Sequence, residues 1–70
     1  MTGMTKREFD RLKVGDFLVN KEGELFKINM DYVFGPPVQV FGAVLQNSEN
    51  YRSIRIDGGN YHFYKRAFPC

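Results

Sequence analysis

The chain has 70 residues, which is enough for one domain whose interior must be filled by a few large side chains. Seven Phe and four Tyr provide that bulk, and a chain this short leaves little room for a catalytic cleft beside a filled core. The formal net charge is only +2, and no apolar run approaches the length of a membrane span.

The single cysteine, Cys70, excludes an intrachain disulfide and a cysteine-based zinc site. Small secreted domains usually contain several disulfides, so this count favours a reducing compartment. Charged residues interrupt every apolar stretch near the start of the chain, which argues against a signal peptide. We therefore expect a soluble cytoplasmic protein that does not cross a membrane.

A short helix is predicted near the start of the chain. Thr5 and Glu8 have the spacing of a capping box, in which each residue satisfies a backbone N–H of the other. Met4 and Phe9 occupy the two positions of a hydrophobic staple. A helix of about two turns is not stable alone, so we expect it to dock through Phe9 and Leu12.

Residues 25–33 give the clearest strand pattern, because apolar and polar side chains alternate along them. This alternation is typical of a half-buried strand. One face of the predicted strand carries Phe26, Ile28, Met30 and Tyr32.

The other predicted strands are shorter or interrupted. Gly42, in the middle of an apolar run, predicts a bend or a bulge. Residues 57–60 read Asp-Gly-Gly-Asn, which is typical of a hairpin turn between the last two strands. The remaining strands are predicted at residues 16–20, 38–46, 51–56 and 61–65.

The predicted last hairpin decides which side chains share a face. A four-residue loop pairs Ile56 with Tyr61, and the next inward pair is Ile54 with Phe63. The opposite face is the first candidate binding face, and it carries Tyr51, Arg55, His62, Tyr64 and Arg66. Tyr and Arg dominate the hot spots of protein interfaces, and they also stack on unpaired bases and neutralise phosphates. The alternative is a strand surface that is merely exposed to solvent.

A second candidate binding element follows the strand at residues 25–33. Phe34 stands beside a glycine and the consecutive prolines Pro36 and Pro37, which cannot donate ladder hydrogen bonds. This loop therefore has the composition of a rigid apolar tip, preorganised to enter a partner's pocket. The alternative is that Phe34 folds back as a lid over one end of the sheet.

The run Val14-Gly15-Asp16, the strand after it, and Gly23 before the next strand resemble the opening of small SH3-like barrels encoded by phages and mobile elements. A plain hairpin at residues 57–60 departs from that pattern, because SH3 folds join their last two strands by a 3₁₀ turn. The expected fold is mostly β: a small five-stranded antiparallel SH3-like barrel or a curled meander with one short N-terminal helix. The expected single domain spans residues 1–70, with a ragged start at 1–4, the helix at 5–13 and the barrel at 16–66.

The sequence contains no pattern typical of a catalytic or metal site. The acids are scattered, and neither a nucleophile motif, a phosphate-binding loop nor zinc-ligand spacing occurs. We therefore expect a protein that is not an enzyme and needs no cofactor or metal.

The leading functional hypothesis is a protein-binding module. The resemblance to phage barrels implies an inhibitor or anti-defence protein, such as an anti-CRISPR-like one, that occludes a larger machine in the host cytoplasm. One alternative is a nucleic-acid-binding barrel that uses the first candidate face, although such proteins usually carry a strongly basic patch. A second alternative is a structural or virion component that assembles with itself through an exposed strand edge.

Overall fold

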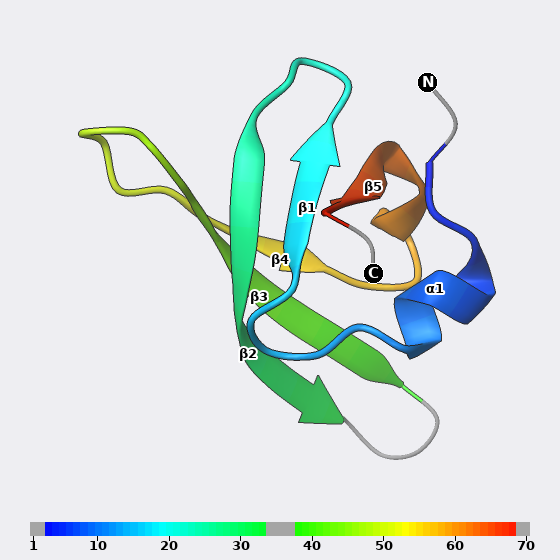
Figure 1. The fold of residues 1–70 in the computed structure, drawn as a ribbon. Coiled ribbons are helices and arrows are strands. Elements are labelled where there is room, and N and C mark those ends of the chain that lie inside the picture. The colour runs from blue at the N-terminus through cyan, green and yellow to red at the C-terminus, as the bar shows by residue number, and fades with distance from the viewer. Residues whose placement is uncertain (1–2, 34–37, 69–70) are drawn as a thin grey trace.

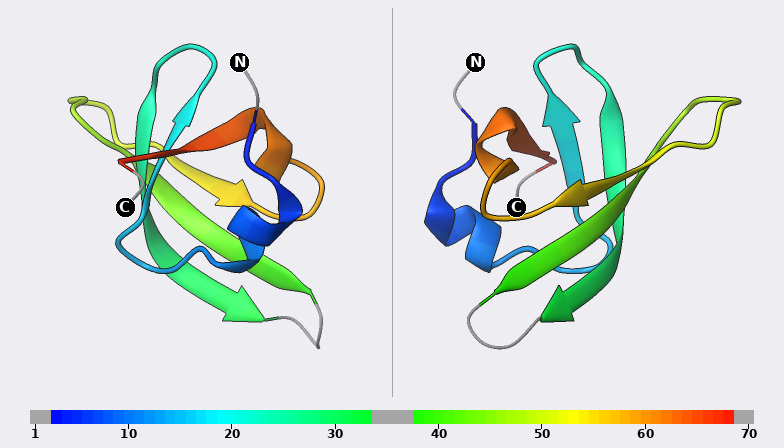
Figure 2. Two further views of the ribbon diagram at one scale, coloured as in Figure 1. Left: turned by 45° about the vertical axis from the view of Figure 1, so that its right-hand side comes forward. Right: turned by 180° about the vertical axis from the view of Figure 1, so that it is seen from behind.

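A computed structural model describes residues 3–33 and 38–68. The elements in chain order are α1 (Lys6–Asp10), β1 (Phe17–Asn20), β2 (Leu25–Val33), β3 (Gln39–Leu45), β4 (Ser53–Ile56), the 3₁₀ helix η1 (Tyr61–Phe63) and β5 (Tyr64–Ala67). The antiparallel strands form one sheet in the order β4-β3-β2-β1-β5, which curls into a half-barrel (Figures 1 and 2). The predicted mostly β fold with one short helix is confirmed.

The predicted hairpin between the last two strands is wrong. β4 pairs with β3 and β5 pairs with β1, so the two strands lie at opposite edges of the sheet. The Asp57 carbonyl accepts the N–H groups of Asn60 (3.3 Å) and Tyr61 (3.0 Å), and this helical turn leads into η1. The connection before the last strand is therefore a 3₁₀ turn and not the plain hairpin expected from the tetrapeptide at 57–60.

The helix begins as predicted and ends earlier. The Glu8 N–H donates to the Thr5 hydroxyl (3.2 Å), and the Glu8 carboxylate accepts the Thr5 N–H (2.9 Å), which completes the capping box. After Asp10, the N–H groups of Arg11 and Leu12 bond carbonyls only three residues back. That tighter geometry ends the α-helix well before the end of the predicted span.

Gly3 and Met4 belong to the fold and do not form a ragged start. The Met4 N–H donates to the Tyr64 carbonyl at 2.8 Å, and the Met4 side chain is buried with Phe9 in the core. Gly3 lies against the His62 backbone so closely that a Cβ at position 3 would sit 1.8 Å from the carbonyl oxygen. This segment therefore runs along the edge of the sheet where β5 begins.

A β-bulge in β2 divides the strand into two parts with opposite facing. Ile28 pairs with Ala43 and Met30 with Gly42, so two residues of β2 advance against one of β3. The alternation reverses beyond such a bulge. The prediction that Met30 and Tyr32 share the inward face of Ile28 is therefore wrong: they are 46% and 36% exposed, whereas Ile28 is fully buried.

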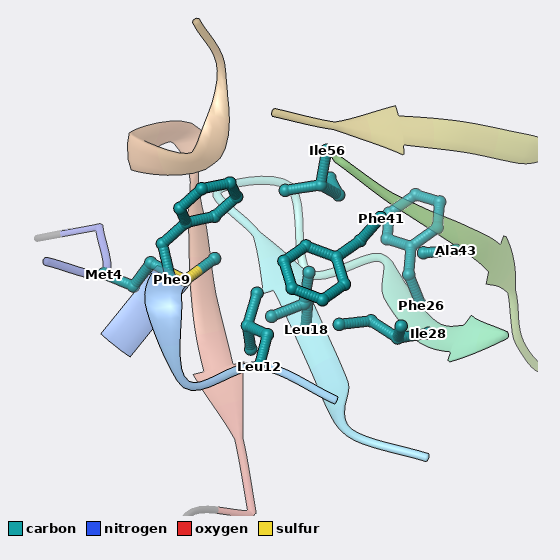
Figure 3. Packing of buried hydrophobic residues seen from close by; sticks show 9 residues of the cluster. All are labelled: Met4, Phe9, Leu12, Leu18, Phe26, Ile28, Phe41, Ala43 and Ile56. Atoms are coloured by element: carbon teal, nitrogen blue, oxygen red, sulfur yellow. The ribbon is translucent and has the colours of Figure 1, made fainter. Parts of the chain in front are cut away.

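The core lies on the inner face of the curled sheet, and α1 and η1 close it (Figure 3). Phe9 of the helix meets Phe41 edge-on at 5.5 Å and stacks on Tyr61 at 4.8 Å. The buried cluster comprises Met4, Phe9, Leu12, Leu18, Phe26, Ile28, Phe41, Ala43 and Ile56. We call the opposite side of the sheet the outer face.

Candidate functional site

The first candidate binding face is not formed, because its members lie in separate parts of the molecule. Arg55 is on the edge strand β4, whereas Tyr64 is on β5 at the other edge. Tyr64 also points inward, where its ring meets Phe26 edge-on at 6.1 Å and packs against the core.

The other three members of that face are equally dispersed. Tyr51 is 79% exposed and precedes β4, while His62 lies in η1. Arg66 is half-buried directly opposite Leu18, on the inner side of β5. The predicted inward residue Phe63 is 62% exposed, so the assumed register fails on both of its faces.

The second candidate element, made of Phe34, Pro36 and Pro37, lies outside the described residues. The residues on either side of it are Val33 and Val38, which are 59% and 49% exposed. The prediction of an apolar tip there remains a prediction.

The outer face of the sheet is largely apolar. The strand register assigns to it Phe17, Val19, Leu25, Lys27, Met30, Tyr32, Val40, Gly42, Val44, Ser53, Arg55, Lys65 and Ala67. Three of these residues are cations and none is an acid. An antiparallel sheet whose second face meets only water normally alternates to polar side chains there. The outer face therefore has the composition of a contact surface.

A groove of about 500 Å³, which we call the outer groove, opens in this face between β2 and β4. Its lining comprises Tyr32, Val40, Phe41, Gly42, Ser53, Ile54 and Arg55. Gly42 lies in β3, between those two strands, and contributes no side chain, and a Cβ there would meet the Met30 Cβ at 3.3 Å. The Tyr32 hydroxyl donates to the Met30 sulfur at 3.1 Å, which fixes the aromatic wall of the groove.

Arg55 forms the wall on the β4 side. Its Nε lies 3.0 Å from the Asp57 carboxylate, whose other oxygen accepts the Gly59 N–H at 2.9 Å. This contact engages one of the five N–H donors of the guanidinium, and the Arg55 side chain is 68% exposed. The arginine is therefore oriented by Asp57 while it keeps donors for a ligand.

Each free edge of the sheet is partly closed by the chain itself. Beside β4, the Asn60 side-chain amide donates to the Arg55 carbonyl (2.7 Å) and accepts the Asp57 N–H (2.9 Å). These are the two backbone groups that one residue of an added parallel strand would bond. Beside β5, the Met4 N–H occupies the Tyr64 carbonyl.

Among the acids that the structure describes, Glu24 has a pKa below its ordinary value, and the contacts that lower it hold parts of the fold together. The Asn20 side-chain amide donates to one Glu24 oxygen (2.8 Å), and Arg52 bonds the other (2.9 Å). The hydrogen bond from Asn20, helped by the Arg52 charge, lowers the pKa of Glu24 below its ordinary value. The Arg52 guanidinium also lies 5.6 Å from the Phe26 ring, so this pair ties the β1–β2 turn to the end of β3–β4.

The Glu24 pKa is lower in the folded chain than in the unfolded chain. The ionised carboxylate therefore stabilises the fold at pH values above the ordinary pKa. This stabilisation is lost as the pH falls through the lowered value. We expect Glu24→Gln to lower the melting temperature at pH 7, and the difference from the native protein to shrink as the pH falls below the ordinary pKa of 4.5. Thermal unfolding at several pH values measures this, and a difference that stays constant with pH would contradict it.

Comparisons of the chain with protein-family models, with curated proteins and with solved structures find no match. Within the described parts of the chain, no three His, Cys, Asp or Glu side chains gather as they would around a metal ion. Neither the helix at residues 6–10 nor the one at residues 61–63 has the length and apolar character required to cross a bilayer. Inference about function therefore starts from the outer face.

Sequence analysis named Arg55 as a candidate binding residue but missed the residues that line the groove with it. Gly42 was the available signal, because a glycine in a strand marks a bulge or a close approach. Placing the bulge opposite Gly42, between Ile28 and Met30, turns Met30 and Tyr32 outward. The groove follows from that one shift.

Proposed function

We propose that this protein is a non-enzymatic binding module that docks on another protein through the outer face of its sheet. The observation that supports this proposal is an outer face of mainly apolar residues with three cations, no acid and a central groove. Tyr32 and Arg55, at the groove walls, are of the residue types that dominate interface hot spots. A domain of this size would act by covering part of a larger protein.

Two other functions have less support. The nucleic-acid hypothesis required Tyr51, Arg55, Tyr64 and Arg66 to share a face, and they lie apart. Self-assembly through a strand edge requires free backbone groups, which Asn60 and Met4 occupy in part at the two edges.

We expect the double variant Met30→Glu with Arg55→Gln to weaken binding of the partner at least about tenfold, because it charges the apolar face and removes a hot-spot arginine. Both side chains are exposed, so thermal stability should change little, by roughly 0.5 kcal/mol or less. Affinity capture from extracts of the native source, quantified by mass spectrometry, measures the loss.

Arg11→Gln is the matched control, because Arg11 is exposed at the end of α1 on the other side of the sheet. It should retain the partner at the native level. Equal retention by the double variant and the control would reject the outer face as the docking surface.

A further inference from the structure

We infer that the outer groove receives an acidic segment of a partner protein that presents an aromatic side chain. This inference rests on the binding function proposed above and specifies the chemistry of the occupant. Charge, shape and the spacing of the cations each support it.

The charge of the outer face calls for an acidic partner. Lys27 and Lys65 have no acidic partner among residues 3–33 and 38–68, and Arg55 pairs with Asp57 through Nε. The other ion pairs of the described chain lie on the helix and at the end of the sheet, away from this face. Complementary potentials favour an acidic surface opposite an uncompensated cationic one.

The shape of the groove suits a planar ring. The groove lies between Tyr32 on β2 and Arg55 on β4, with Gly42 and the nearly fully buried Val40 in its lining. An aromatic side chain placed in the groove would pack against the Tyr32 ring on one side and the Arg55 guanidinium on the other.

A nucleic acid also combines rings with negative charge, but this face suits it poorly. Lys27, Arg55 and Lys65 lie on three different strands and are separated by apolar residues. A single strand of nucleic acid needs a continuous cationic track beside its stacking platforms. Isolated cations spread over an apolar face, with Arg55 alone in the described lining of the groove, match a protein segment with a few carboxylates.

The test uses the acidic random copolymer of glutamate and tyrosine, titrated into the isotope-labelled protein and followed by amide NMR shifts. We expect saturable shifts at outer-face amides such as Gly42 and Val44, and binding about tenfold tighter than that of polyglutamate, which lacks the ring. Arg55→Gln should weaken copolymer binding about fivefold, since it removes both the charge and the stacked guanidinium. Arg11→Gln should leave it unchanged.

Several results would overturn the inference. A lysine–tyrosine copolymer or an oligothymidylate that binds these amides at least as tightly would assign the groove to other chemistry. Amide shifts confined to the helix side of the sheet would also overturn the inference. So would the absence of any amide shift when the copolymer is present at a millimolar concentration of its residues. A partner captured through the outer face by a basic or uncharged segment would reject the acidic aromatic occupant while leaving the proposed binding function intact.

Discussion

Replacing Phe41 by alanine is expected to lower the free energy of unfolding by about 3–5 kcal/mol. Phe41 is 1% exposed in β3, meets Phe9 edge-on, and stands opposite Ile56 of β4. It therefore joins the helix to the edge of the sheet, and its removal leaves a cavity that neither element can fill. Because a domain this small has only a few kcal/mol of stability to lose, a large share of the variant should be unfolded at 37 °C.

Urea unfolding followed by circular dichroism measures the loss at Phe41. Val38→Ala serves as the control, because this side chain is half exposed and should cost no more than roughly 0.5 kcal/mol. A loss below about 1 kcal/mol for Phe41→Ala would mean that helix and sheet do not share one core.

Replacing Gly3 by alanine is expected to destabilise the fold by about 1–3 kcal/mol, although it adds only one methyl group. The new Cβ would lie 1.8 Å from the His62 carbonyl oxygen, a backbone atom that cannot rotate away. The chain would have to move off the β5 edge, which would break the bond from the Met4 N–H to Tyr64 and expose Met4.

Gly58→Ala provides a comparison with the same chemical change. A Cβ at Gly58 would meet no atom within 4 Å, so its effect should be neutral or slightly stabilising. Thermal unfolding of both variants distinguishes the two sites. If Gly3→Ala were as stable as Gly58→Ala, the segment before the helix would not be docked on β5.

The parts of the fold that local chemistry determines were predictable from sequence. The capping box at Thr5 and Glu8 needs only residues three apart. The bulge predicted at Gly42 lies instead in the paired strand, between Ile28 and Met30 of β2, so the glycine marked the place but not the strand. The pairing of β5 was not predictable in the same way. The turn at 57–60 is compatible with a hairpin, and the actual partner of β5, strand β1, lies more than forty residues earlier.

The pairing of β5 with β1 is the reason that the first candidate binding face does not form. With β5 moved to the opposite edge, Tyr64 turns inward against Phe26, and Arg55 remains on the outer face beside Gly42. A second change came from the bulge, since one extra residue reverses the facing of Met30 and Tyr32. The outer groove, whose lining comes from β2, β3 and β4, depends on the bulge and not on the position of β5.

The most direct test of the outer face as the docking surface is site-specific photo-crosslinking in cells of the native source. A benzophenone amino acid at position 30 would stand on the outer face, and one at position 11 would stand at the end of the helix. We predict a specific protein adduct from position 30 and none from position 11. An adduct from position 11 alone, or equal yields from both positions, would contradict the proposed surface.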